Sequence, residues 1–223
     1  MPLCVAPLQS PVLSQKGNTI QHGFFTRKGG TSTGYYNSLN VSISKELTPQ
    51  TALENRKRIS HFFNQHSKNL CFSTQVHGNM PLFIDAPYDP LGPPEADALI
   101  TSTPEVILSI QTADCVPILL YDQTNQMIAA IHGGWKSLLG GIISKTIDLM
   151  AEKSELKIYR SQDLIAGIGP CISQDSYEIG QDIFNLFYEQ SADYKSFFKK
   201  SYLKGKYQFD IQGLAAHQLR QRG

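Results

Sequence analysis

The chain has 223 residues, of which 41% are hydrophobic and 17% charged, a balance typical of a globular domain with a substantial core rather than of a disordered chain. Its 20 basic and 19 acidic side chains leave a formal net charge of +1. Because no basic block of the kind that neutralises a phosphate backbone is present, the composition argues against nucleic-acid binding. The first residues do not have the pattern of a signal peptide, the apolar segments are too short to span a bilayer, and four dispersed cysteines do not suit a disulfide framework. We therefore expect a cytoplasmic protein without a membrane partner.

The first half of the chain is predicted to alternate between strands and helices. Hydrophobic periodicity and the positions of glycine and proline predict strands at 19–26, 70–76, 98–101, 106–111 and 115–122, a helix at 52–65 and a proline-rich loop at 85–95. Within the last of these strands Pro117 cannot donate a hydrogen bond, which favours an edge strand or a bulge.

The second half continues the same alternation. It predicts strands at 126–131 and 164–168, a helix at 135–153, a largely helical stretch at 180–198, and a segment at 208–211 that leads into a final helix at 212–221. No repeat or linker interrupts the pattern. The simplest interpretation is one α+β domain of mixed sheets covered by helices, spanning residues 1–223.

Three predicted strands end at a histidine or cysteine next to small residues. These positions are His77 before Gly78, Cys115 after Ala113-Asp114, and His132 before Gly133-Gly134. Two imidazoles and a thiolate favour zinc or copper, and three protein ligands would leave a fourth position open, as in catalytic zinc sites. The separations of 38 and 17 residues (115 − 77 and 132 − 115) match no local ligand motif, so the alternatives of a core cysteine and turn histidines stay open at this point.

Four ordered motifs, together with an amino-terminal pattern, resemble one family along almost the whole chain. That family is the bacterial laccase-domain proteins, also called purine nucleoside phosphorylase-like or multicopper polyphenol oxidase-like. The motifs are Gln75-Val76-His77-Gly78, Ala113-Asp114-Cys115-Val116-Pro117-Ile118, His132-Gly133-Gly134-Trp135 and Gly167-Ile168-Gly169-Pro170-Cys171-Ile172, preceded by Phe24-Phe25-Thr26-Arg27-Lys28-Gly29-Gly30, Ser38-Leu39-Asn40 and Glu54-Asn55-Arg56.

The resemblance implies an α/β/β/α layered fold and zinc, with copper as the other possibility, held by His77, Cys115 and His132. It also implies purine nucleoside chemistry: phosphorolysis of adenosine, inosine and methylthioadenosine, and deamination of adenosine through a metal-bound water. The partners would then be a nucleoside and phosphate, with the oligomeric state left open.

Several further residues are candidates for parts of that chemistry. Asp114, beside Cys115, is a candidate proton shuttle. Arg27, with Lys28 and the Gly29-Gly30 turn, offers positive charge and backbone amides to a phosphate. The amides of Asn40 and Gln75 are candidates for reading a nucleobase or ribose.

Two departures from the family pattern bear on the substrate site. Lys136 stands where the family usually has arginine, which keeps the charge and loses the bidentate fork. The chain stops at Gly223, whereas relatives normally continue into a further Arg- and Tyr-containing strand segment. We therefore expect this carboxy-terminal segment of the family to be missing here.

Three other functions remain open. One is a copper-dependent polyphenol oxidase, although six histidines are too few for a full multicopper set. Another is an amidase acting on a peptidoglycan precursor, with Cys115 as nucleophile and His132 as base, or with a metal. The third is a structural zinc site that Cys171 closes as fourth ligand. The segment Glu54-Asn55-Arg56-Lys57-Arg58 is interpreted as a solvated helix face, and Trp135 as a packing residue.

Overall fold

A mixed five-stranded sheet lies at the centre of the computed structural model, which describes residues 5–45, 48–154 and 161–223. The strands lie in the order β2-β3-β6-β5-β7, and only the β2–β3 pair is parallel. Their bounds are β2 Pro81–Phe83, β3 Ala98–Thr101, β5 Val116–Asp122, β6 Met127–Gly133 and β7 Leu164–Ile168.

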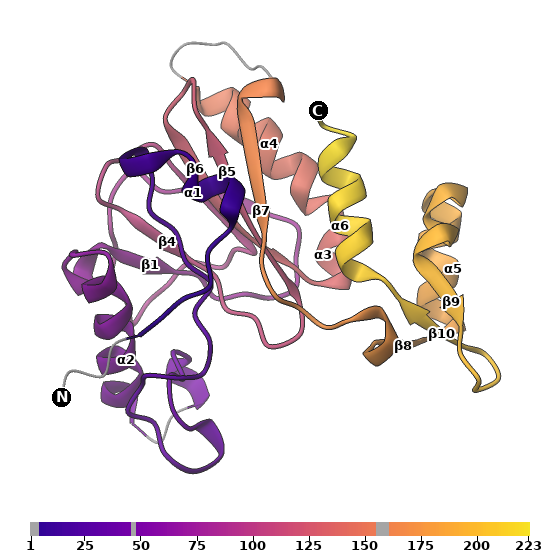
Figure 1. Ribbon diagram of the computed structural model, residues 1–223, viewed down its shortest axis with the longest axis horizontal. Coiled ribbons are helices and arrows are strands. Elements are labelled where there is room, and N and C mark those ends of the chain that lie inside the picture. The colour runs from indigo at the N-terminus through magenta and orange to yellow at the C-terminus, as the bar shows by residue number, and fades with distance from the viewer. Residues whose placement is uncertain (1–4, 46–47, 155–160) are drawn as a thin grey trace.

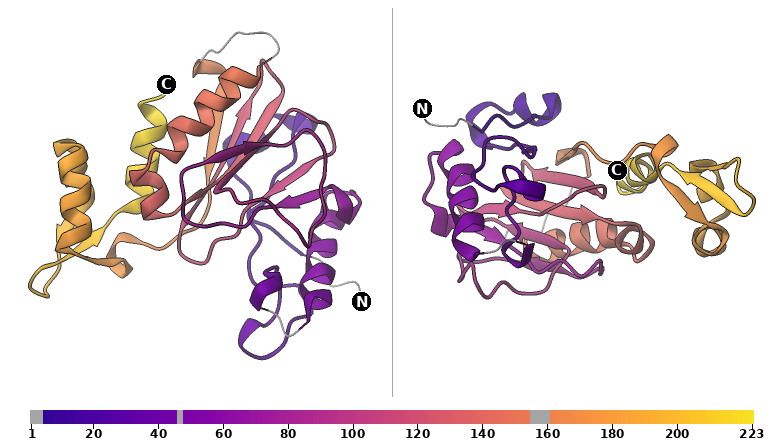
Figure 2. Two further views of the ribbon diagram at one scale, coloured as in Figure 1. Left: turned by 180° about the vertical axis from the view of Figure 1, so that it is seen from behind. Right: turned by 90° about the horizontal axis from the view of Figure 1, so that it is seen from below.

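Two smaller sheets accompany the central one. A parallel pair joins β1 Leu70–Phe72 to β4 Ile107–Ser109. A three-stranded antiparallel sheet has the order β8-β10-β9, with β8 Glu178–Gly180, β9 Phe198–Lys200 and β10 Lys206–Phe209. Together with α5, this last sheet extends away from the central sheet (Figure 2).

Helices cover the sheets on their outer sides. The described residues form α1 Pro11–Ser14, α2 Pro49–Phe62, α3 Trp135–Leu139, α4 Ile142–Lys153, α5 Gln181–Gln190 and α6 Ile211–Arg220. Helices α4 and α6 pack on one face of the central sheet, and the β1–β4 pair with α2 lies on the other side (Figure 1). The expected layered arrangement of helices and mixed sheets is therefore confirmed.

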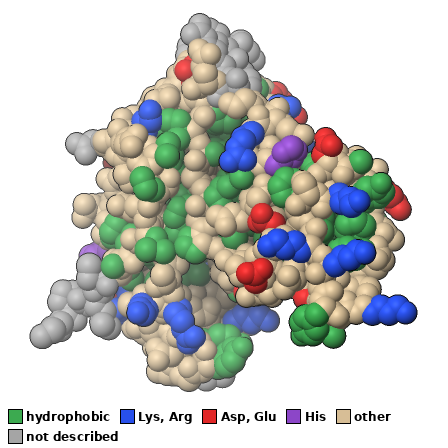
Figure 3. Space-filling model, turned by 45° about the vertical axis from the view of Figure 1, so that its right-hand side comes forward, with side chains coloured by type: hydrophobic (Ala, Val, Ile, Leu, Met, Phe, Trp, Pro, Cys, Tyr) green, Lys and Arg blue, Asp and Glu red, His purple; other side chains and the backbone are tan. Residues whose placement is uncertain are grey.

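The main core lies between the central sheet and its helices. Ile118 and Ile131 of the sheet meet Ile143 and Leu214 of the helices, and all four side chains are completely buried. On the surface of this side, basic and acidic side chains are interspersed (Figure 3), as the nearly balanced composition predicts. Among the described residues, no helix has both the length and the apolar character that a bilayer span requires.

The strand predicted at 19–26 is wrong. Only Phe24 makes a strand-like pairing there, a single antiparallel bridge to Leu8. Phe25 instead packs edge-on against Phe62 and Phe63 at the end of α2. The apolar residues of this segment are explained by side-chain packing against a helix, which needs no ladder of hydrogen bonds.

The edge position or bulge predicted from Pro117 is also wrong, because β5 is paired on both sides. The carbonyl of Pro117 accepts a hydrogen bond from the Gly169 N–H just beyond the end of β7. The nitrogen of Pro117, which has no hydrogen to donate, therefore lies opposite a residue beyond the end of β7. No hydrogen bond of the β5–β7 ladder is lost, so proline is tolerated in this interior strand.

Two predicted helices are each interrupted once. The stretch 135–153 divides into α3 and α4 at Gly140-Gly141, where Gly141 adopts a positive φ of 76° that favours glycine. The stretch 180–198 divides at Ser191, after which Ala192–Phe197 forms a 3₁₀ helix.

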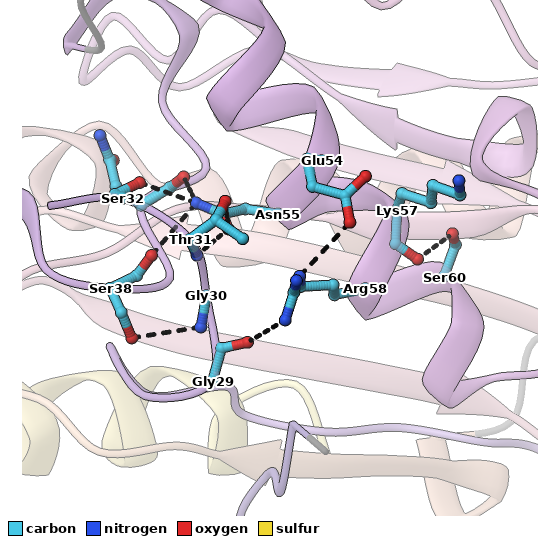
Figure 4. A network of polar contacts seen from close by, with 11 residues as sticks. Gly29, Gly30, Thr31, Ser32, Ser38, Glu54, Asn55, Lys57, Arg58 and Ser60 are labelled. Atoms are coloured by element: carbon cyan, nitrogen blue, oxygen red, sulfur yellow. Dashed lines mark hydrogen bonds and ion pairs between the residues drawn. The ribbon is translucent and has the colours of Figure 1, made fainter. Parts of the chain in front are cut away.

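Helix α2 holds the amino-terminal loop through buried polar side chains. The interpretation of 54–58 as a solvated face is therefore wrong for Asn55 and Arg56, whereas Glu54 and Lys57 are exposed as expected. Asn55 is completely buried, and its amide donates to the Ser32 hydroxyl and the Asn40 carbonyl while accepting from the Thr31 N–H (Figure 4). Arg56 is buried as well. Its guanidinium donates to the Val41 carbonyl and lies 4.0 Å from the centre of the Phe72 ring.

We expect Asn55→Ala to lower the free energy of unfolding by about 2–4 kcal/mol, because it leaves several buried donors and acceptors without partners. Urea denaturation measures this change. Lys57→Ala is the matched control on the same helix, since Lys57 is exposed, and it should change stability by less than about 0.5 kcal/mol. Equal stabilities of the two variants would contradict the structural role of Asn55.

Candidate metal centre

Three side chains from distant parts of the chain converge at one end of the central sheet. One donor atom from each of His77, Cys115 and His132 lies within 4.8 Å of the others. The Cys115 Sγ is 4.0 Å from the His77 Nε2, and the two imidazole rings meet edge-to-face with centroids 4.7 Å apart. Because ligands of a tetrahedral zinc stand roughly 3.5 Å apart, a small inward movement suffices to close the three around one cation.

Strand pairing places two of these ligands. His132 is the next-to-last residue of β6, and Cys115 immediately precedes β5. The antiparallel register joins Val116 to Gly133, so Cys115 falls beside Gly134 at the same end of the hairpin. His77 comes from the loop between β1 and β2 and adopts a positive φ of 56°, an uncommon conformation for a residue with a side chain.

Gly134 keeps the space between the three ligands clear. A Cβ atom at this position would lie 3.0 Å from the His77 ring, 3.6 Å from the Cys115 Sγ and 3.6 Å from the His132 ring. A side chain here would therefore crowd both imidazole rings and the sulfur. The donor set and the glycine together fit a bound zinc or copper ion.

Asp97 contacts both histidine segments and was missed by the sequence analysis. It is 1% exposed and precedes β3. Its Oδ1 lies 2.7 Å from the His132 Nδ1 and accepts from the His77 N–H. Its Oδ2 accepts from the Val76 and Gly78 N–H groups. The one signal in the sequence is an acidic residue directly before the apolar run 98–100, where a buried carboxylate needs partners.

Electrostatics in the centre act differently on the cysteine and the buried histidine. Burial lowers the pKa of His132, which favours the neutral imidazole that a metal requires. Burial raises the pKa of the Cys115 thiol, and the carboxylates of Asp114 and Asp97 raise it further. Without a cation the sulfur is therefore held as a thiol.

Cys171 and Tyr177 lie near the centre without joining the group of three. Among the described residues, the group that can hold a metal contains His77, Cys115 and His132 and not Cys171. Burial raises the pKa of the Tyr177 phenol to about 12, with further contributions from Cys115 and Asp114. Asp114 itself is exposed, and its carbonyl accepts from the Ile172 N–H.

Arg27 and Asn40 line a cavity of about 1030 Å³ between the amino-terminal segment and the central sheet. Thr112 and Ala113, just before Asp114, belong to the same lining, whereas the three ligands do not. The Arg27 Nε donates to the Asn37 carbonyl, and the Asn40 side chain accepts from the Ser42 N–H. Both predicted residues therefore share one cavity that runs toward the metal centre.

The Gly29-Gly30 turn is a weaker anion site than the sequence predicted. The Gly30 N–H donates to the Ser38 hydroxyl and the Thr31 N–H to Asn55, so these amides already have acceptors. A phosphate bound here would rely on side-chain charge rather than on a cradle of backbone amides.

Gln75 and Lys136 make contacts of their own. The Gln75 amide donates to the Gln111 carbonyl and accepts from the Gln111 N–H, which gives it a structural part in joining two loops. Lys136 is exposed at the start of α3, and its Nζ lies 5.5 Å from the centre of the Trp135 ring.

A mixed-sheet α+β fold with a two-histidine, one-cysteine centre defines the class of this protein. The profile of the family described as multi-copper polyphenol oxidoreductase laccase matches residues 21–223, and the chain belongs to that family. It is 32% identical over 205 residues to a purine nucleoside phosphorylase of Rickettsia conorii, which covers 92% of this chain and 80% of the relative.

Solved structures agree with the fold. A Neisseria meningitidis protein matches with a TM-score of 0.77 at 30% identity, over 89% of this chain and 77% of its own. The Bacillus licheniformis protein YfiH matches with a TM-score of 0.82 at 24% identity, over 90% of this chain and 77% of its own, and supports the fold alone.

We expect Cys171→Ser to keep a full equivalent of metal, because Cys171 lies outside the group of three donor residues. Cys115→Ser removes a thiolate ligand and should lower the bound metal to a small fraction of one equivalent. Elemental analysis of both purified variants measures the difference. Loss of metal from Cys171→Ser would indicate a closed structural site with four ligands.

Proposed function

We propose that this chain is a zinc-dependent purine nucleoside enzyme that phosphorolyses adenosine, inosine and methylthioadenosine and also deaminates adenosine. The observation that carries the proposal is the three-ligand centre, whose donors converge on a space kept clear by Gly134. Three ligands leave one coordination position for chemistry, as in catalytic rather than structural zinc sites. The reaction class follows from the name of the Rickettsia relative, a purine nucleoside phosphorylase.

The chain's own residues supply the remaining functions in this proposal. Zinc, when bound, supplies Lewis acidity at its open position. Asp114 is assigned the transfer of a proton to or from a nucleoside at the centre; its carboxylate is exposed and adjoins Cys115 in the chain, which supports this assignment. The largely apolar walls of the neighbouring cavity suit a purine ring.

Phosphate is assigned to Arg27. Arg27 lines the cavity, its Nε is held by the Asn37 carbonyl, and charge-assisted hydrogen bonds to phosphate are stronger than neutral ones. Asn40 lines the same cavity and is proposed to contact the nucleoside, whereas Gln75 is assigned to structure because of its pairing with Gln111. A cytoplasmic location is part of the proposal, since Cys71, Cys115 and Cys171 are free thiols.

A copper-dependent polyphenol oxidase is the second candidate, favoured by the family description. The described residues include all six histidines, yet only His77 and His132 belong to a group that can hold a metal. His22 accepts from the Ser10 N–H, and His217 packs against Phe197. The part of the chain that the structure describes therefore offers ligands for one metal ion rather than for a full multicopper set, and oxidase activity would require copper at this centre.

An amidase with a free cysteine nucleophile is the third candidate, and the orientation of His132 by Asp97 favours it. Against it, two carboxylates near Cys115 oppose formation of a thiolate. Thiol alkylation beside metal analysis separates the two: a stoichiometric metal that shields Cys115 supports the metal enzyme, and rapid alkylation of active, metal-free protein supports the amidase.

The direct test follows adenosine, inosine and phosphate together with metal-quantified protein. We expect Arg27→Ala to raise the KM for phosphate roughly tenfold or more, because one charge-assisted contact is lost, and to leave adenosine deamination within about twofold. Arg220→Ala, an exposed arginine on α6, is the control and should change neither activity. Equal loss of both activities in Arg27→Ala would contradict the assignment of phosphate, and inactivity of zinc-loaded wild type toward every nucleoside would overturn the proposed function.

A further inference from the structure

We propose that Asp97 is a positioning residue that sets both histidine ligands in binding geometry before a metal arrives. This inference rests on the proposed metal centre. One carboxylate accepts hydrogen bonds from the backbone of His77 and from the ring of His132, although these two residues are 55 positions apart in the chain (132 − 77).

The His77 segment is arranged around this carboxylate. Three successive N–H groups, those of Val76, His77 and Gly78, donate to Asp97 at 3.2, 3.0 and 2.6 Å. Successive amides that point to one side form a concave anion-binding nest, and here the chain's own carboxylate fills it. The left-handed conformation of His77, with φ of 56°, is part of this nest and costs free energy that the three hydrogen bonds offset.

His132 is held by the same residue from two directions. Its backbone N–H donates to the Asp97 carbonyl at 2.8 Å, and its Nδ1 lies 2.7 Å from Asp97 Oδ1. A carboxylate accepts hydrogen bonds, so the neutral ring carries its proton on Nδ1 and presents the lone pair of Nε2 to the centre. The side chain of Asp97 therefore fixes the tautomer of one ligand and the backbone of the other.

The consequence is a centre in which the imidazole of His132 and the backbone that carries His77 are set without metal. Carboxylates that orient ligating histidines typically contribute 10- to 100-fold to metal affinity. In this chain one substitution at Asp97 would disturb both the His132 ring and the backbone of His77, so we expect an effect within that range.

The test measures zinc affinity by chelator competition in wild type, Asp97→Asn and Asp122→Asn. Asparagine keeps the shape of Asp97 but turns an NH₂ group toward N–H donors, so we expect zinc affinity to fall about 10- to 100-fold. Asp122 is the matched control: it is 3% exposed, and its carboxylate accepts from Thr124 and Asn125 at the opposite end of the β5–β6 hairpin. Asp122→Asn should keep wild-type zinc affinity although it also loses buried hydrogen bonds.

Nitrogen-15 NMR of the histidine rings in metal-free protein gives a second readout. We expect the Nδ1–H form of His132 in wild type and a population of the Nε2–H form in Asp97→Asn. Wild-type zinc affinity in Asp97→Asn, or equal weakening in Asp122→Asn, would overturn the proposal. Finding the Nε2–H form of His132 in metal-free wild type would overturn it too. This readout needs no variant, so it decides the question even if Asp97→Asn fails to fold. If wild type bound no zinc, the proposed function would fail, while the NMR readout would still decide the positioning role of Asp97.

Discussion

The antiparallel pairing of β5 with β6 is the constraint on which the candidate centre depends. Its register places Cys115 beside the turn that follows His132, and β3 joins the other edge of β6 so that Asp97 lies next to the same histidine. A shift of one residue in either pairing would turn the side chains concerned to the opposite face of the sheet. The apolar residues packed beneath, such as Ile118 and Ile131, therefore fix the position of the ligands as well as the stability of the fold.

Much of the fold could be predicted because the strands of the central sheet near the site are strongly apolar and two of them, β6 and β7, run into glycine. The strands at 98–101 and 164–168 agree with the predicted bounds, and β5 and β6 differ from theirs only at the ends. Breaks in the longer helices could not be placed as well, because the conformation of Gly141 and Ser191 depends on how the segments on each side pack. The prediction from Pro117 failed because the preference of proline for edge strands takes no account of where the neighbouring strand ends, which only the tertiary structure shows.

The buried face of α2 carried a signal that the sequence analysis did not use. Asn55 and Arg56 lie three and four residues after Ala52, on the same stripe as Ile59, and that stripe faces the core. The charge and polarity of these two side chains favoured solvent exposure, whereas their position on the helix predicted that they are buried. For the metal ligands, the residue types indicated the chemistry, but their spacing in the sequence could not show that they meet. His77 reaches the β5–β6 hairpin through a loop whose backbone is held by Asp97.

The balance of charge argues for a cation at this centre. The carboxyl groups of buried Asp97 and exposed Asp114 both raise the pKa of the Cys115 thiol, and desolvation lowers the pKa of buried His132. A thiolate formed here without a counter-charge would stand near two carboxylates, one of them buried, and this repulsion is costly. A divalent cation removes that cost and makes the thiolate the favoured form of Cys115. The carboxylates that disfavour a free cysteine nucleophile thus favour metal binding at the same three side chains.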